Sequence, residues 1–124
     1  MIDHVSIPVS NLRKSAEFYE SLLAELEYKK LVSRSGTVGF GKKYPDFWLN
    51  ERPALSVEGS NDGFHVCVRA SSVEQVNAFH RKGVALGGKS DGIPGLREQY
   101  SKSYYAAFIR DADGNRLEAV TFVS

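Results

Sequence analysis

Two histidines and one glutamate, His4, His65 and Glu118, have the types and positions of metal ligands. Each is expected on a β-strand in which branched apolar residues alternate with the set that contains the ligand. Because the branched apolar set is the better candidate to pack on helices, the three side chains should point to the other face of their sheets. Two imidazoles and a carboxylate that leave coordination positions open suit non-haem Fe(II), and also Mn(II) or Zn(II). If the two sheets curl toward each other, the pattern predicts a metal site in a cleft.

The chain repeats its own beginning at an offset of 61 residues, which sets His65 on His4. The next positions align without a gap, including the pairs Val5 with Val66, Ile7 with Val68, Ser10 with Ser71 and Phe18 with Phe79. Each copy predicts a strand that carries one His, a Ser or Asn at a helix start, and an amphipathic helix. Because the repeat occurs only twice, it indicates a duplicated module within one domain rather than a solenoid.

The first module is predicted to be βαβββ. Alternation and turn residues predict a strand at 2–9, a helix at about 12–26 that Ser10 or Asn11 caps, strands at 30–34, 37–41 and 46–50, and at 54–57 either a short extension or a connection to the second module.

The second module is predicted to repeat this order. The pattern predicts a strand at 64–69 and a helix that begins with a capping box of Ser71 and Glu74 and ends at Gly83. A short strand at 86–89 is followed by a long loop at 91–102, which is expected to act as a lid. The module ends with strands at 103–110 and 115–122, joined by a turn at 111–114.

Length and composition limit the class of protein. The length of 124 residues predicts one domain, 1–124, with modules at about 1–58 and 62–124. The predicted fold class is α+β, in which two paired βαβββ modules form an open, U-shaped mixed sheet around a cleft. The net charge of +1 gives no electrostatic case for binding nucleic acid or an anionic membrane. The single cysteine, Cys67, excludes an intrachain disulfide, and no long apolar run is present. A soluble, cytoplasmic protein is expected.

Three segments carry a resemblance to a known family. They are Ile2–Val9, Phe64–Val66 and Tyr105–Glu118, and the last contains the most specific stretch, RDADGNRLE. The chain resembles a small member of the vicinal oxygen chelate superfamily, the glyoxalase, bleomycin-resistance and extradiol-dioxygenase group. The resemblance implies that His4, His65 and Glu118 bind a divalent metal (Fe, Mn, Zn or Ni), that the partner is a small-molecule substrate or ligand, and that the protein is a homodimer.

The chain also departs from individual branches of that family. Glyoxalase I enzymes have a fourth ligand, a Glu, where this chain has Phe47–Leu49, which disfavours lactoylglutathione lyase activity. Extradiol dioxygenases need only two His and one Glu, but relatives often carry a His before the tyrosine pair, where this chain has 100–103. Fosfomycin-modifying relatives have a phosphonate-binding Arg after the Glu, and Ala119–Ser124 contains none.

Other side chains are candidates for the same site. Tyr105 is the first choice, before Tyr104, for a catalytic group that donates a hydrogen bond to a developing oxyanion, and Glu118 is the other catalytic candidate. The predicted substrate pocket consists of Phe40, Trp48, Cys67 and Tyr104, although the aromatic residues can equally fill the core. Cys67 shares a face with His65, but a small buried hydrophobe is the favoured interpretation. Arg69, Arg97 and Arg116 are expected to be solvated rather than to bind an anion.

Three classes of function remain open. The first is a metal-dependent lyase, isomerase or dioxygenase that acts on a small oxygenated substrate through bidentate chelation. The second is a metal-free protein of the same fold that binds a small molecule or confers drug resistance. The third is an accessory domain whose site is vestigial. Only His4, His65 and Glu118 favour the first class over the others.

Overall fold

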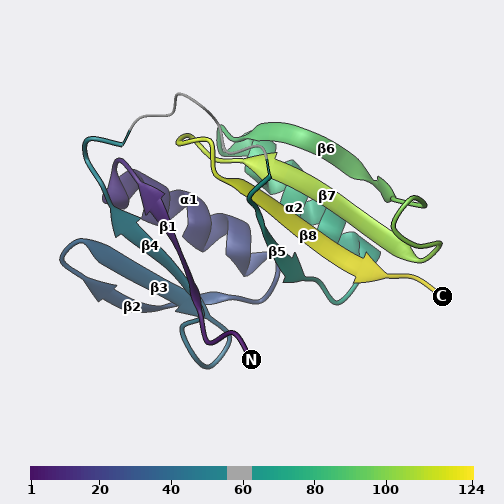
Figure 1. The fold of residues 1–124 in the computed structure, drawn as a ribbon, viewed down its shortest axis with the longest axis horizontal. Coiled ribbons are helices and arrows are strands. Elements are labelled where there is room, and N and C mark those ends of the chain that lie inside the picture. Colours follow the sequence, from purple (N-terminus) through teal and green to yellow (C-terminus); the bar gives the residue numbers. More distant parts are fainter. Residues whose placement is uncertain (56–62) are drawn as a thin grey trace. The chain divides into compact units, whose positions relative to one another are not determined.

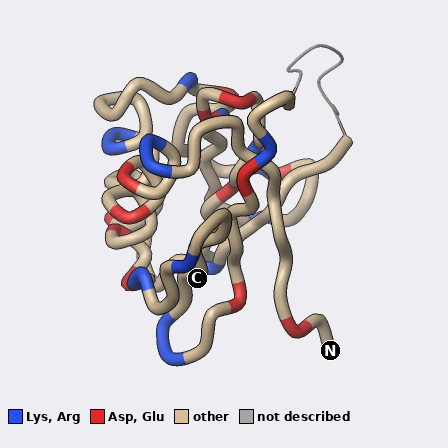
Figure 2. The backbone as a smooth tube through the Cα atoms, turned by 90° about the vertical axis from the view of Figure 1, so that its left-hand side faces the viewer, with Lys and Arg blue, Asp and Glu red and all other residues tan. Residues whose placement is uncertain are grey.

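The computed structural model of the chain describes residues 1–55 and 63–124. Its contacts divide the chain into two compact units, Met1–Glu58 and Gly59–Ser124. Basic and acidic residues are interspersed along the backbone rather than gathered in one block of either charge (Figure 2). Within the described residues, no helix has the length and apolar character needed to cross a membrane.

The first unit is a four-stranded mixed sheet with one helix (Figure 1). Its elements are β1 (Val5–Val9), α1 (Leu12–Ala24), β2 (Lys29–Arg34), β3 (Thr37–Gly41) and β4 (Phe47–Glu51). The strand order is β1-β4-β3-β2, in which β1 pairs parallel with β4 and the other neighbours are antiparallel. At the predicted extension at 54–57, Ala54 lies in a turn and Leu55 in no regular element, and the last two residues lie outside the described residues.

The second unit has the same architecture. Its elements are β5 (Val66–Arg69), α2 (Val73–Ala85), β6 (Lys89–Leu96), β7 (Tyr104–Arg110) and β8 (Arg116–Phe122). The strand order is β5-β8-β7-β6, again with one parallel pair, β5 with β8. Figure 1 shows α2 lying along one face of this sheet.

The structure confirms the α+β class and the duplicated βαβββ module. β5 starts 61 residues after β1, and both bounds of α2 lie 61 residues after those of α1. The offset found in the sequence is therefore the offset between equivalent elements. His4 and His65 each stand directly before the first strand of their unit.

The core of each unit lies between the helix and one face of its sheet. In the first unit, the helix face of the sheet carries alternate residues of β1, β3 and β4, and α1 contributes its apolar stripe. These buried side chains are Ile7, Val9, Tyr19, Leu22, Leu23, Val38, Phe40, Phe47 and Leu49. Helix α1 begins at the predicted cap, because the Asn11 side chain accepts a hydrogen bond from the Lys14 N–H at 3.1 Å.

Two predictions about α2 are wrong. Ser72, not Ser71, is the N-cap, and its hydroxyl accepts from the Gln75 N–H at 3.2 Å. Gly83 does not end the helix, which continues to Ala85. A Cβ atom at Gly83 would lie 2.9 Å from both Cδ1 and Cγ1 of Ile109. The glycine therefore lets α2 approach β7 closely, and the chain turns later, at Gly87, where φ is +97°.

The predicted loop at 91–102 is wrong over its first half, and so is the predicted lid there. Strand β6 starts at Lys89, after a turn at Leu86 and Gly87 where the strand at 86–89 is predicted, and pairs antiparallel with β7 as far as Leu96. Its register shifts between Ser90 and Gly92 and again between Gly92 and Gly95. These irregularities, together with the glycines, remove the alternation that identifies a strand in a sequence.

The close approach at Gly83 yields a stability prediction. Gly83→Ala should lower the free energy of unfolding by about 1 kcal/mol. Overpacking of the new methyl group against buried Ile109 costs about 1–3 kcal/mol. The higher helix propensity of Ala offsets about 1 kcal/mol of that cost. Urea denaturation measures the change. Val84→Ala, at an exposed position of the same helix, is the control and should be near neutral. A more stable Gly83→Ala variant would contradict the packing described here.

Candidate functional site

Glu118 is a buried carboxylate with polar partners on both oxygen atoms. The residue is 2 % exposed. Its Oε1 lies 3.0 Å from Nε2 of His65, and its Oε2 accepts a hydrogen bond from the Tyr104 hydroxyl. The His65 side chain remains 33 % exposed. The buried Glu118 carboxylate is thus in contact with the His65 imidazole, which is partly exposed to solvent.

The strand register explains why these residues meet. In the parallel pair of β5 with β8, Cys67 lies opposite Glu118, and His65, two residues earlier, points to the same face. In the antiparallel pair of β7 with β8, Phe108 lies opposite Glu118. The Tyr104 side chain shares this face because it is four residues before Phe108. The ring of His65 packs edge-on against the Phe108 ring at 5.9 Å.

Tyr104 is a hydrogen-bond donor that resists ionisation. Desolvation raises the pKa of its hydroxyl well above the usual range, and the hydrogen bond to Glu118 raises it further. A phenol with a raised pKa keeps its proton at neutral pH. Tyr104 therefore holds one carboxylate oxygen of Glu118 and leaves the other facing His65.

Cys67 is an exposed free thiol, which corrects the expectation of a small buried hydrophobe. Even so, local desolvation raises the pKa of the thiol to about 12, and the adjacent Glu118 carboxylate adds to this shift. The thiol is consequently protonated at neutral pH and is a poor nucleophile. The structure places Cys67 beside Glu118 and Tyr104, as the sequence predicts.

Tyr104 contacts Glu118, whereas Tyr105, the first choice for a donor to a developing oxyanion, does not. Adjacent residues of a strand point to opposite faces of the sheet. The Tyr105 hydroxyl donates a hydrogen bond to Oδ1 of Asn77 at 2.7 Å, and Asn77 belongs to α2. Tyr105 therefore lies on the helix face, away from the carboxylate.

In the first unit, His4 is exposed and is held by a carboxylate. Its Nδ1 lies 2.7 Å from Oδ2 of Asp3, and the Tyr44 hydroxyl donates to the same carboxylate at 3.0 Å. The hydrogen bonds from His4 and then from Tyr44 lower the pKa of Asp3. A carboxylate on one ring nitrogen is the usual arrangement for a histidine whose other nitrogen binds a metal. Nε2 of His4 is thus the nitrogen that Asp3 does not engage.

Phe40 and Trp48, which are predicted for the substrate pocket, lie on opposite faces of the first sheet. Phe40 is fully buried on the helix face, where its ring packs against Phe47. Phe40 therefore belongs to the core and not to a pocket. Trp48 lies on the other face, together with Ser6 of β1, and its ring covers Gly39. A Cβ atom at Gly39 would lie 2.8 Å from the indole ring.

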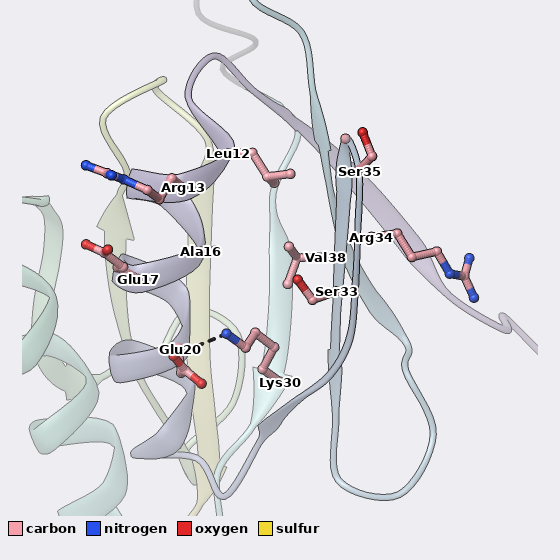
Figure 3. A pocket seen from close by; sticks show the side chains of 11 residues that line it. Leu12, Arg13, Ala16, Glu17, Glu20, Lys30, Ser33, Arg34, Ser35 and Val38 are labelled. Carbon is pink, nitrogen blue, oxygen red and sulfur yellow. Dashed lines mark ion pairs between the residues drawn. The ribbon is translucent and has the colours of Figure 1, made fainter.

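The first unit also contains a pocket that the sequence did not indicate. It lies between α1 and the β2–β3 hairpin and has a volume of about 460 Å³ (Figure 3). Leu12, Ala16 and Val38 line its apolar part, and the pair Lys30–Glu20, with a nitrogen–oxygen distance of 3.8 Å, lies at one side. None of the predicted site residues lines this pocket.

The chemistry and spacing of His65 and Glu118 fit two ligands of a divalent metal. A nitrogen and an oxygen that each lie about 2.1 Å from one ion, at about 90° to each other, are about 3 Å apart. The observed separation of Nε2 from Oε1 is 3.0 Å. Over residues 1–55 and 63–124, no group of three or more His, Cys, Asp or Glu side chains capable of holding a metal is found. The structure thus provides a two-donor pair, and His4 remains a predicted ligand.

Sequence reasoning missed Phe108 and the pair Asp3–Tyr44. Phe108 is ten residues before Glu118 across the Asp111–Gly114 turn, so a correct hairpin register would have placed the two opposite each other. Asp3 was available as the neighbour of His4, but its bond to Tyr44 joins residues 41 positions apart and has no local signal.

Comparisons with known proteins agree with this architecture. A family model described as the Glyoxalase/Bleomycin resistance protein/Dioxygenase superfamily matches residues 1–119. The metallothiol transferase FosB of Shouchella clausii (strain KSM-K16) is 26% identical over 120 residues, which are 97% of this chain and 79% of the relative.

Solved structures show the same fold. A glyoxalase/bleomycin resistance protein from Albidiferax ferrireducens T118 superposes with a TM-score of 0.84 at 29% identity, covering 95% of this chain and 96% of the other. A FosX variant from Listeria monocytogenes, complexed with Mn(II) and 1S,2S-dihydroxypropylphosphonic acid, has a TM-score of 0.75 at 16% identity and covers 99% of this chain and 90% of its own; this likeness concerns the fold alone. Because the family model matches nearly the whole length and the βαβββ module is duplicated, the chain belongs to the glyoxalase/bleomycin resistance/dioxygenase superfamily, the vicinal oxygen chelate proteins.

Proposed function

We propose that this protein is a divalent-metal-dependent lyase, isomerase or dioxygenase that acts on a small molecule through two adjacent oxygen atoms. The observation that carries the proposal is the pair of donor atoms, His65 Nε2 and Glu118 Oε1, at 3.0 Å. His65 and Glu118 would supply two ligands of the metal, and the sequence repeat predicts His4, the counterpart of His65, as a further ligand. A divalent ion bound there supplies Lewis acidity, which stabilises negative charge that develops on substrate oxygens.

The surrounding side chains prepare these donors for that role. The Tyr104 hydroxyl keeps its proton and donates a hydrogen bond to Oε2 of Glu118, which fixes the carboxylate plane and leaves Oε1 for binding. Phe108 packs against the His65 ring and limits its rotation. Asp3 engages Nδ1 of His4 and so favours the tautomer in which Nε2 has a free lone pair. Each donor thus has a partner that orients it.

The relatives support the proposal at the level of chemistry. The FosX variant is complexed with Mn(II) and with an acid that carries two neighbouring hydroxyl groups. FosB is named a metallothiol transferase. The FosX complex is consistent with a divalent ion and a small oxygen-rich ligand in a protein of this fold, and neither relative names the substrate of this chain.

A metal-free binding protein is the second candidate. It is favoured by the direct contact of His65 with Glu118, which can equally be an ion pair that neutralises a buried carboxylate. The two candidates differ in one respect: only the enzyme requires that the histidine bind an ion.

Metal content tests the proposed function. In protein purified without chelator or metal-affinity tag, elemental analysis should find close to one divalent ion per chain, which His65→Ala should lose. His80→Ala is the control, because His80 lies on α2 and bonds to Ser90 at 2.7 Å. The metal indicates the chemistry, with Fe or Mn favouring dioxygenase activity and Ni or Zn isomerisation. Wild-type protein that contains no metal and takes up none would refute the enzyme proposal.

The paired tyrosines give a sharper test. Tyr104→Phe removes the donor to Glu118 and should weaken the affinity for Zn(II) or Mn(II) by about tenfold or more, because groups that orient metal ligands contribute about 10–100-fold. Tyr105→Phe removes the same atom from the opposite face and should leave the affinity unchanged. Calorimetric titration of chelator-treated protein measures both. Equal affinities of the two variants would exclude the role given to Tyr104.

A further inference from the structure

The pocket between α1 and the β2–β3 hairpin exists because small side chains face each other across it. On β2, Ser33 lies opposite buried Val38 and therefore points to the helix face of the sheet. Ala16 lines the same space from α1. Neither side chain is long enough to fill the gap, which has a volume of about 460 Å³ (Figure 3). Small-molecule sites typically have volumes of about 300–1,000 Å³, so the space is large enough for a ligand.

The duplicated module shows which residues occupy the equivalent space in the second unit. Asn77 of α2 lies 61 residues after Ala16 and is its counterpart. Strand pairing makes Tyr105 the counterpart of Gly36, because each directly precedes a residue that pairs with an equivalent position of the last strand. The pairings that establish this are Pro8–Asn50–Thr37 in the first unit and Arg69–Val120–Ala106 in the second.

The second unit fills this space, and the first unit leaves it open. In the second unit, the Tyr105 hydroxyl donates to Oδ1 of Asn77 at 2.7 Å and so connects the sheet with the helix. In the first unit, glycine and alanine stand at the two positions. A Cβ atom at Gly36 would meet no described atom within 4 Å. The pocket is therefore a feature of the first unit alone, and not a consequence of the module's architecture.

Two opposite charges face the pocket. Among the described residues, Nζ of Lys30 is paired with Oε1 of Glu20 at 3.8 Å, which is longer than a hydrogen bond. Figure 3 shows the other charged lining residues directed away from the space: Arg13 and Glu17 project from the far side of α1, and Arg34 points away from the helix. The pocket thus offers one ammonium and one carboxylate, without net charge, beside an apolar floor.

We propose that this pocket binds a free α-amino acid with an aliphatic side chain, such as leucine. The ligand's carboxylate would pair with Lys30, its ammonium with Glu20, and its side chain would cover Leu12, Ala16 and Val38. A zwitterion pairs with both charges at once, whereas a simple acid leaves Glu20 without its cation and a simple amine does the reverse. None of the proposed metal ligands lines the pocket, so the proposal is independent of the proposed function.

Four probes separate the features of the ligand. Leucine has all of them, glycine lacks the aliphatic side chain, isocaproate lacks the ammonium group, and isopentylamine lacks the carboxylate. Calorimetry measures binding to the full chain after chelator treatment, because amino acids themselves bind divalent metals. Leucine should bind about tenfold or more tightly than each of the other three, since a charge-assisted hydrogen bond contributes about tenfold or more. His65→Ala should bind leucine as the wild type does, which distinguishes the pocket from the proposed metal site.

Variants locate the binding. Lys30→Met and Glu20→Gln each remove one charge and should weaken leucine binding by about tenfold. Lys29→Met, on the same strand but outside the pocket, is the matched control and should have no effect. Ala16→Leu and Ser33→Leu fill the space from α1 and from β2, so each should abolish binding. Circular dichroism verifies the folding of every variant, and leucine should shift the amide resonances of residues 33–38 in the wild type.

Several results would overturn the site. They are the absence of leucine binding at millimolar concentration, equal effects of Lys30→Met and Lys29→Met, and unchanged binding in the two variants that fill the space. Isocaproate or isopentylamine that binds as tightly as leucine would overturn the assignment of a zwitterion. Because these titrations use metal-free protein, their failure leaves the proposed function unaffected. Wild-type protein that never takes up metal but binds leucine would refute the proposed function and support the pocket.

Discussion

The burial of the Glu118 carboxylate is the constraint around which the second unit is organised. An unpaired charge at 2 % exposure would cost several kcal/mol, so each oxygen needs a partner. His65 serves one oxygen from the start of β5, and Tyr104 serves the other from the start of β7. Because the two partners come from strands on either side of β8, the carboxylate connects three strands of the sheet.

The same pairing links stability to the proposed chemistry. A carboxylate held on both sides is rigid, and a rigid donor binds a metal with little loss of conformational freedom. Burial, with a further contribution from the carboxylate, raises the pKa of Tyr104 and of Cys67, and both groups keep their protons at neutral pH. These groups consequently orient and donate, whereas proton abstraction requires another base or the substrate itself.

Sequence reasoning reached those parts of the site that depend on strand alternation alone. The repeat at an offset of 61 residues and the parity of each strand placed His65, Cys67 and Glu118 on one face, as the structure has them. The alternation alone does not say which face of β7 carries Tyr104, because this depends on the register of the hairpin with β8. The structure places Tyr105, the first choice over Tyr104, on the helix face, away from Glu118. Phe40 was predicted in the pocket and lies in the core, because an aromatic side chain suits either face of a sheet. The glycine-rich strand β6 was predicted to be a loop because its bulges hide the alternation of a strand. Without that strand, the sequence could not predict that Arg97 lies over the Phe108 ring.

The most direct test of the central claim, that His65 and Glu118 bind a divalent metal, is the anomalous-difference map of a crystal grown with Zn(II). The account predicts a peak about 2.0–2.2 Å from both Nε2 of His65 and Oε1 of Glu118, with Tyr104 still bonded to the other carboxylate oxygen. A map with no peak there, in which His65 and Glu118 remain in direct contact, would contradict the account and favour a metal-free ion pair.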